Sequence, residues 1–251
     1  IPILLPEEAI IEGLSDGGRH PSVSSLCDLY DRAYSHGGLM GTELDMIYDR
    51  VTKEALIGFA EPLSGKRILD VGAGTGHLWH YITGSVHGHA IDLSKVGLGR
   101  ALARRPTLTA AVAIAEFLPY EDGFFDAVFA ADTIEHTLSP EKSLAEIRRV
   151  LKPDGVLSLS LPIPQSLRKW GWNQLVYERV GLRFLGKLIW VIAKRILLFG
   201  KPEFQPIDRD YDLQEWRRLI DAAGYSIETA LAWPEPPRAP IVYLVKATAR
   251  D

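Results

Sequence analysis

The chain has 251 residues, with 47% hydrophobic, 24% charged and 9% aromatic side chains, a composition typical of a globular protein with a sizeable core and untypical of disordered or fibrous chains. Its 28 Lys and Arg residues against 32 Asp and Glu residues give a formal net charge of −4, so the surface as a whole does not attract nucleic acid. The single cysteine, Cys27, excludes an internal disulfide and fits a reducing compartment, and we expect a cytoplasmic protein.

Residues 1–60 are predicted to form an N-terminal helical lid segment, and residues 61–251 are predicted to form one core domain. After a glycine-rich stretch at 37–41, apolar side chains recur at the spacing of one helix face. These side chains are Leu44, Ile47, Val51, Ala55 and Leu56. The spacing predicts that the segment is helical.

From residue 67 onwards, short apolar runs alternate with helical stretches, and Gly, Asp and Pro bound the runs. Runs of this kind are typical of buried parallel strands. A helix capped by Ser139 and ended by residues 153–155 is predicted before the last run, and a helix at 211–223 is predicted to precede an antiparallel hairpin. The pattern predicts a doubly wound, Rossmann-like α/β sheet that is mostly parallel. The five runs lie at 68–71, 90–93, 109–114, 127–131 and 156–161, and the hairpin strands at 225–229 and 241–247.

An insertion at about 163–207 interrupts this alternation and is predicted to be helical, basic and apolar. Residues 165–201 contain eight Lys and Arg residues and one Glu, so their formal charge is +7. The rest of the chain therefore carries −11. The apolar runs of the insertion are far shorter than the ~20 residues of a spanning helix. The alternatives are a lid or dimer-contact helix, an in-plane helix at an anionic membrane surface, or a phosphate-binding segment. The negative remainder of the chain disfavours the last, so no nucleic-acid partner is expected.

A glycine-rich loop follows the first predicted strand, and acidic residues stand at the ends of the first two strands. Glycines let the backbone turn sharply and let a ligand lie against bare peptide groups at the start of a helix. Asp70 would repel a pyrophosphate but suits a ligand that carries an ammonium group. Asp92 follows Gly76 by 16 residues, and a carboxylate there can accept hydrogen bonds from both hydroxyls of a ribose.

Four segments carry a resemblance to a known family. They read ILDVGAGTG at 68–76, AIDLS at 90–94, AEFLPYEDGFFDAVFAADTIEH at 115–136 and RRVLKPDGVL at 148–157. In this order they resemble the motifs of the class I S-adenosylmethionine-dependent methyltransferases, in particular the type 11 family of small-molecule enzymes. The resemblance implies the Rossmann-like methyltransferase fold and S-adenosyl-L-methionine as the cofactor.

The resemblance also implies which residues bind the cofactor. The glycine loop and Asp70 are expected beside its methionine part, Asp92 beside its ribose, and residues 115–116 around its adenine. Ile114 departs from the family, because relatives often carry there an Asp that accepts from the adenine amino group, so adenine recognition is expected to rest on backbone groups and apolar neighbours. The full predicted set is Asp70, Gly72, Ala73, Gly74, Gly76, Asp92, Leu93, Ala115, Glu116, Phe117 and Asp132.

Three residues are candidates for catalysis. His136 follows the fourth predicted strand, at the edge where such sheets bind ligands, and is either a general base or, as we favour, a structural histidine. Asp132 comes directly after the same strand and is expected to point toward the transferred methyl group or to cap the residues that follow. His36 is either a second base or a surface residue. No metal site is predicted, because no Cys or paired carboxylate completes the set of His77, His80, His87 and His89.

These observations predict an enzyme that moves the methyl group of S-adenosyl-L-methionine to an oxygen or carbon of a lipophilic small molecule, such as a natural-product intermediate, a quinone or a lipid. The alternative is a protein that uses the same cofactor site for cyclisation or decarboxylation, or for regulation without turnover. The expected partner is the acceptor molecule. Peripheral membrane contact through residues 165–201 and a homodimer remain open alternatives.

Overall fold

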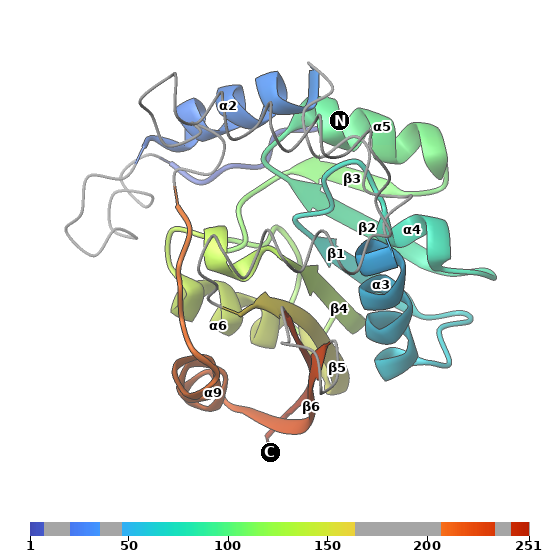
Figure 1. Ribbon diagram of the computed structural model, residues 1–251. Helices are drawn as coiled ribbons and strands as arrows, with labels where there is room; N and C mark the ends of the chain where they lie inside the picture. Colours follow the sequence, from blue (N-terminus) through green and yellow to red (C-terminus); the bar gives the residue numbers. More distant parts are fainter. Residues whose placement is uncertain (8–20, 36–46, 164–206, 234–241, 251) are drawn as a thin grey trace, which may run out of the picture.

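A computed structural model describes residues 1–7, 21–35, 47–163, 207–233 and 242–250 of the chain. These residues form a seven-stranded sheet with helices on both faces (Figure 1). The strand order is β3-β2-β1-β4-β5-β7-β6. The strands are β1 (Arg67–Val71), β2 (His87–Asp92), β3 (Thr109–Val112), β4 (Phe125–Ala131), β5 (Leu151–Pro162), β6 (Tyr225–Trp233) and β7 (Val242–Ala249).

The sheet is mostly parallel. Strands β1 to β5 run in one direction, and β7 pairs antiparallel with both β5 and β6. This confirms the predicted doubly wound sheet with a C-terminal antiparallel hairpin. The chain builds β2 and β3 on one side of β1 and then returns to place β4 on the other side, so the order reverses between β1 and β4. Sheets of this kind bind ligands outside the carboxyl ends of the strands at such a reversal.

Two helical layers cover the sheet, and the alternation of side chains along the strands explains both. Ile68 packs into a core with residues of α3, α4 and α5, whereas its neighbour Leu69 packs into the opposite core with residues of α6 and α9. Successive side chains of a strand point to opposite faces, so an apolar run is buried on both. The helices are α3 (Ile47–Ala60), α4 (Leu78–Tyr81), α5 (Lys95–Arg104), α6 (Pro140–Val150) and α9 (Leu213–Ala222).

Polar side chains begin three of these helices. Ser139 accepts a hydrogen bond from the Lys142 backbone N–H at 3.3 Å, with Pro140 in the first turn of α6, as the sequence predicted. Ser94 caps α5 in the same way, and Asp212 forms a capping box with Glu215 at the start of α9. Such caps satisfy backbone N–H groups that have no partner within the helix.

Strand β5 begins earlier than the sequence predicted. Residues 153–155 were expected to end a helix, but α6 already ends at Val150 and β5 starts at Leu151. In the pairing with β4, Leu151 stands opposite Phe125 and Val156 opposite Ala127, which leaves residues 152–155 opposite Asp126 alone. The Lys152 ammonium group pairs with the Asp126 carboxylate across this irregularity. A long-range pairing therefore decides the boundary, and Pro153 and Gly155 mark a bulge.

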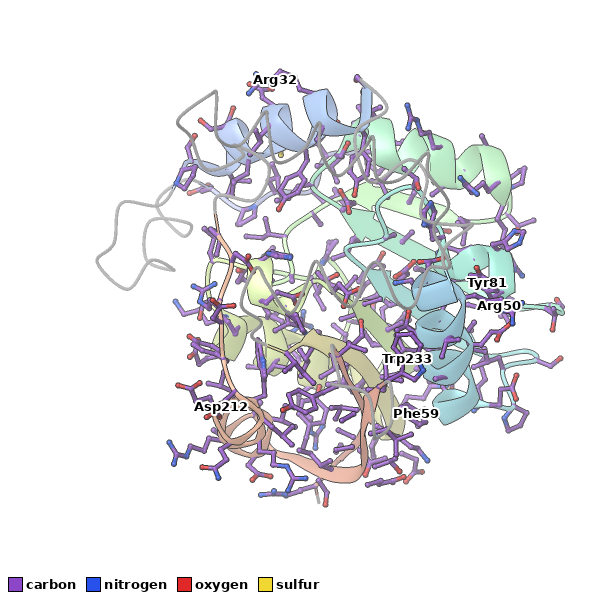
Figure 2. All side chains as sticks on the ribbon, viewed as in Figure 1. Arg32, Arg50, Phe59, Tyr81, Asp212 and Trp233 are labelled. Atoms are coloured by element: carbon purple, nitrogen blue, oxygen red, sulfur yellow. The ribbon has the colours of Figure 1, made fainter. Side chains whose placement is uncertain are left out.

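The two described helices of the N-terminal segment have different positions. Helix α3 packs Leu56 and Ile57 into the sheet-facing core, and the partly buried Phe59 and Trp233 (Figure 2) border the same core. Helix α2 (Val23–Ser35) lies instead beside α5, above the carboxyl ends of the strands (Figure 1). The lid predicted for residues 1–60 stays a prediction: of its two described helices, α2 lies over the strand ends and α3 packs against the sheet.

Two predictions fall on parts of the chain that are not described. His36 lies in 36–46, and most of the predicted insertion, including residues 165–201, lies in 164–206. Among the described residues, no helix has the length and apolar character needed to cross a membrane.

Candidate functional site

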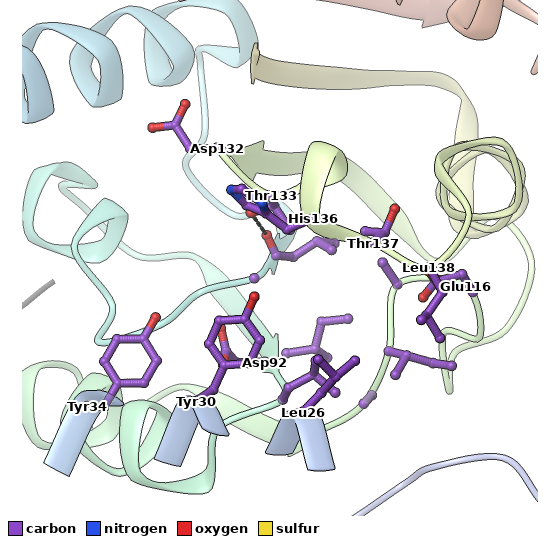
Figure 3. Close-up of a pocket in the computed structure, with 17 residues that line it drawn as sticks. Leu26, Tyr30, Tyr34, Asp92, Glu116, Asp132, Thr133, His136, Thr137 and Leu138 are labelled. Atoms are coloured by element: carbon purple, nitrogen blue, oxygen red, sulfur yellow. Dashed lines mark hydrogen bonds between the residues drawn. The ribbon is translucent and has the colours of Figure 1, made fainter. Parts of the chain in front are cut away.

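A pocket opens at the carboxyl ends of the central strands, and helix α2, at the bottom of Figure 3, forms one of its sides. Its wall combines residues from the ends of β1, β2, β3 and β4 with one face of α2 and the loop before α6. The reversal of strand order between β1 and β4 places these strand ends around one crevice. The lining residues are Leu26, Tyr30, Tyr34, Val71, Gly72, Ile91, Asp92, Leu93, Ala113, Ile114, Ala115, Glu116, Asp132, Thr133, His136, Thr137 and Leu138.

The glycine loop is shaped by close packing. Gly72 has a φ of 71°, and a Cβ atom there would lie 2.4 Å from the side chain of Thr133. Thr133 is fixed in turn, because its hydroxyl donates to the Val71 carbonyl at 3.2 Å and to the Ala131 carbonyl at 3.0 Å. Only glycine readily adopts this left-handed backbone conformation and also lacks the Cβ atom for which there is no room. Gly72 also lines the pocket, so its peptide group borders the space that a ligand would occupy.

Asp92 is the carboxylate that connects the loop to the second strand. Its Oδ2 atom accepts from the Gly74 N–H at 2.8 Å, and its Oδ1 atom accepts from the Ser94 N–H at 2.7 Å. The side chain is 9% exposed, and burial raises the pKa of its carboxyl to about 6. Each carboxylate oxygen can accept two hydrogen bonds, so Asp92 retains capacity for ribose hydroxyls on its pocket side. This residue fits the ribose of the cofactor that the sequence implies.

Asp70 lies beneath the glycine loop and outside the pocket wall. It is 3% exposed, and its Oδ2 atom has no hydrogen-bond partner among the described residues. Burial raises the pKa of the Asp70 carboxyl to about 7, and the charge of the buried Lys53 on α3 opposes that rise. An ionised Asp70 would favour a cationic ligand above the loop. The sequence did not identify Lys53, because only the packing of α3 brings it near Asp70.

The predicted adenine residues divide into two groups. Ala115, Glu116 and Leu93 line the pocket, whereas Phe117 does not and is 43% exposed. The Glu116 carboxylate accepts from the Ser139 N–H at 2.9 Å, which ties the pocket wall to the start of α6. Burial raises the pKa of Glu116. The loop residues Ala73, Gly74 and Gly76 also lie outside the wall, where they shape the turn.

His136 lines the pocket but is engaged in a structural contact. Its Nδ1 atom lies 2.8 Å from the Ile207 carbonyl oxygen, which can only accept, so Nδ1 carries the proton. The Nε2 atom is 3.6 Å from a carboxylate oxygen of Glu135. Glu135 is buried, and burial together with the charge of Asp132 raises the pKa of its carboxyl well above the usual range. His136 thus joins Ile207, which follows the undescribed residues 164–206, to the loop after β4.

Arg209 strengthens the same junction. Its guanidinium group donates to the Leu138 carbonyl at 2.8 Å and also to the Thr137 carbonyl, and its backbone N–H donates to the Glu135 carbonyl at 3.2 Å. The side chain of Ile207 is buried in a cluster with Leu138 and apolar residues of α2. These contacts hold the return of the chain directly beside the pocket. Nothing in the sequence pattern marked Ile207 or Arg209.

Asp132 has a strained backbone at the end of β4. It is the non-glycine residue with a positive φ, 50°, in the described part of the chain. The Ser160 hydroxyl holds it, since this group donates to Asp132 Oδ1 at 2.8 Å and accepts from the Asp132 N–H at 2.9 Å. Figure 3 shows its carboxylate turned away from His136. Backbone strain of this kind collects at ligand-binding positions, and Asp132 lines the pocket.

Helix α2 contributes side chains that the sequence did not assign to the site. Leu26, Tyr30 and Tyr34 follow the four-residue spacing of one helix face, and this spacing was the available signal. Both tyrosine hydroxyls point into the pocket in Figure 3. Burial raises the pKa of Tyr30 to about 12, so its hydroxyl stays neutral and can donate a hydrogen bond.

The histidines near the glycine loop contact different residues. His77 lies 3.7 Å from the carboxylate of Asp49, and His89 contacts the rings of Tyr120 and Phe124. No group of three potential metal ligands occurs among the described residues.

Comparisons with known proteins agree with this geometry. Residues 69–159 match the family described as methyltransferase domain. The ubiquinone/menaquinone biosynthesis C-methyltransferase UbiE of Roseobacter denitrificans is 30% identical over 193 residues, which cover 71% of this chain and 74% of that protein. The malonyl-[acyl-carrier protein] O-methyltransferase of Geobacter sulfurreducens is 38% identical over 109 residues, 41% of each chain.

Solved structures show the same fold. The 1,6-didemethyltoxoflavin-N1-methyltransferase of Burkholderia thailandensis, determined with its substrate and S-adenosylhomocysteine, superposes with a TM-score of 0.61. The superposition covers 100% of this chain and 94% of that one at 16% identity. Likeness at this identity concerns the fold alone.

The strand-end pocket, the glycine loop and the buried Asp92 define a nucleoside-binding Rossmann-like protein. The chain belongs to the class I S-adenosylmethionine-dependent methyltransferases with the type 11 methyltransferase domain. The predictions of family, fold, cofactor and enzyme class are therefore confirmed.

We expect Asp92→Ala to weaken the binding of S-adenosylhomocysteine about 10- to 100-fold, because the ribose hydroxyls lose a charged acceptor worth roughly 1.5–3 kcal/mol. Titration calorimetry measures this. Asp126→Ala is the matched control, since Asp126 also accepts a backbone N–H, from Arg67 at 2.8 Å, but lies near the amino end of β4, away from the carboxyl ends that form the pocket. The control should lose stability and keep its affinity. Equal affinities for Asp92→Ala and wild type would place the ribose elsewhere.

We expect His136→Ala to lower the melting temperature, since it removes the hydrogen bond to Ile207, worth about 1 kcal/mol. Turnover should fall only as far as it does in Arg209→Ala, which breaks the same junction but removes no base. Melting curves and rates at saturating cofactor are measured together for both variants. A His136→Ala protein with an unchanged melting temperature and a far larger loss of turnover than Arg209→Ala would instead identify His136 as the base.

Proposed function

We propose that this methyltransferase acts on a neutral, lipophilic hydroxyaromatic molecule of the quinol type, at a ring carbon or oxygen. The observation that carries the proposal is the charge of the pocket wall. Asp92, Glu116 and Asp132 contribute carboxyl groups, and no Lys or Arg occurs among the described lining residues. The remaining lining is largely apolar or aromatic.

This distribution of charge argues against an acceptor that enters as an anion. A carboxylate or phosphate near Asp132 would add negative charge in a partly desolvated site, where like charges repel strongly. A neutral ring would escape this repulsion, and the lining side chains other than these carboxyl groups are largely apolar or aromatic. The relatives support the same choice, because the quinone C-methyltransferase matches over 74% of its length and the malonyl-[acyl-carrier protein] enzyme over 41%.

The residues of the chain act mainly by binding and alignment. When bound, S-adenosyl-L-methionine supplies a methyl group already activated on a sulfonium. Asp92 and the glycine loop would hold its nucleoside and methionine parts, and α2 would exclude water from above. Holding two reacting groups in line can supply on the order of 7 to 11 kcal/mol at best.

The demand for a base is small in this proposal. The acceptor loses one proton as it gains the methyl group, and a quinol hydroxyl ionises far more readily than an alcohol. Of the predicted bases, His136 donates to Ile207 and Asp132 is held by Ser160, while His36 lies outside the described residues. We therefore assign neither described residue the role of an essential base.

An acceptor panel tests the proposal. The purified protein is incubated with methyl-labelled S-adenosyl-L-methionine and either a demethylated hydroquinone or a malonyl thioester of equal chain length. We expect label in the hydroquinone, with kcat/KM at least about tenfold higher than for the carboxylate, since one repelling charge in a site of this kind costs more than ~1.4 kcal/mol. Label found preferentially in the carboxylate would contradict the proposal. A matched hydroquinone that carries a carboxyl group on its ring separates the effect of charge from that of the ring.

A lipophilic acceptor of this kind resides in membranes, and we propose that residues 165–201 bring the enzyme to an anionic membrane surface. The support is the sequence alone, a charge of +7 together with large apolar side chains. In flotation, the protein should rise with anionic vesicles at low salt and less at moderate salt, and Arg183, Lys187 and Lys194 changed to Gln should reduce this. Protein that stays in the aqueous fraction at both salt concentrations would leave the lid or dimer helix as the explanation.

A further inference from the structure

One charged contact joins helix α2 to the cofactor-binding part of the sheet. The Oδ1 atom of Asp31 accepts from the Ser94 hydroxyl at 2.5 Å and from the Val96 N–H at 3.0 Å. Ser94 is the N-cap of α5, and its hydroxyl oxygen accepts in turn from the Gly97 N–H at 2.9 Å. Asp31 thus adds a second, charged cap to the same helix start, where negative charge is favoured.

A second contact on the same face of α2 reaches the glycine loop. Tyr34 follows Asp31 by three residues, so the two side chains share a helix face. A Cβ atom on Gly74 would lie 2.6 Å from the Tyr34 hydroxyl oxygen, and one on Gly97 would lie 3.2 Å from the Tyr34 ring. The ring therefore packs where the loop and α5 come together, and a side chain at position 74 would collide with its hydroxyl group.

The contacts of Asp31 and Tyr34 involve two residues that donate hydrogen bonds to Asp92. The Ser94 N–H and the Gly74 N–H both donate to the Asp92 carboxylate. Asp31 binds the hydroxyl of Ser94, and Tyr34 packs on Gly74. The position of α2 and the orientation of Asp92 consequently depend on the same two residues.

We propose that Asp31 is a positioning residue, which holds α2 closed over the cofactor so that Tyr30 and Tyr34 cover it. The proposal depends on cofactor binding and holds whichever acceptor is used, so a failed acceptor panel would not affect it. Toward its amino end α2 is held by apolar packing of Val23 and Leu26 against Ile207 and its neighbours. Toward its carboxyl end Asp31 supplies the charged contact, and a helix of 13 residues has little stability of its own.

The test compares three variants of the full chain. Asp31→Ala removes both hydrogen bonds, Asp31→Asn keeps an oxygen that can accept them, and Asp28→Ala is the matched control, since Asp28 is exposed on the same helix one turn earlier. Affinity for S-adenosylhomocysteine is measured by calorimetry. Hydrogen exchange of residues 23–35 is measured with and without this ligand, with β4 as an internal reference.

We expect Asp31→Ala to bind S-adenosylhomocysteine about tenfold more weakly, Asp31→Asn to recover most of that loss, and Asp28→Ala to match the wild type. Ligand should slow exchange in residues 23–35 of the wild type and of Asp31→Asn, and this protection should be absent in Asp31→Ala while β4 stays protected. Two results would overturn the proposal. One is wild-type affinity and protection in Asp31→Ala, and the other is a loss of protection in β4 as well, which would show that Asp31 supports the fold and not the lid.

Discussion

The Asp92 carboxylate accepts backbone hydrogen bonds from the glycine loop on one side and from the start of α5 on the other. The carboxylate is buried, so its negative charge would cost much free energy there without these donors. The donors in turn need a loop that turns back toward β2, which Gly72 and Ala73 provide by donating to the Ile91 carbonyl, each at 2.9 Å. One buried charge therefore fixes the loop, the second strand and the fifth helix relative to one another, and the pocket forms between them.

The rest of the pocket is built around this centre by segments distant in sequence. Helix α2 closes it from above through Asp31 and Tyr34. Residues 207–209 close it from the side, where His136 and Arg209 join them to the loop after β4. Leu26 and Ile207 meet in one apolar cluster, so the two covering segments support each other.

Much of the fold could be predicted from the sequence, because its signals are local. A strand buried on both faces is a short apolar run, and Ser139 marks a helix start by its chemistry. The glycine loop with Asp70 and Asp92 indicated the cofactor through signals that are also local. The glycines allow the backbone to turn, and the Asp92 carboxylate can accept hydrogen bonds from a ribose. Asp92 lines the pocket as expected, whereas the structure places Phe117 and Asp70 outside its wall.

The remaining features depend on contacts between distant residues. The early start of β5 is set by its pairing with β4, because Leu151 pairs with Phe125 at the beginning of β4. Ser94 and Asp31 are separated by 63 positions, and His136 and Ile207 by 71. No local spacing in the sequence indicates such pairs. The sequence therefore could not decide whether His136 is a general base or a structural histidine, and it did not identify Asp31 at all. The structure shows that His136 takes part in a junction between segments.

Asp92 and helix α2 in its closed position should together form the cofactor site. A crystal structure of the protein with S-adenosylhomocysteine would show whether they do. We expect both ribose hydroxyls within hydrogen-bond distance of the Asp92 carboxylate, the ligand beside Gly72, and Tyr30 and Tyr34 over it with Asp31 still bound to Ser94. A ligand bound with its ribose away from Asp92, or one that is covered only after the contact between Asp31 and Ser94 has broken, would show that these groups do not form the site in this way.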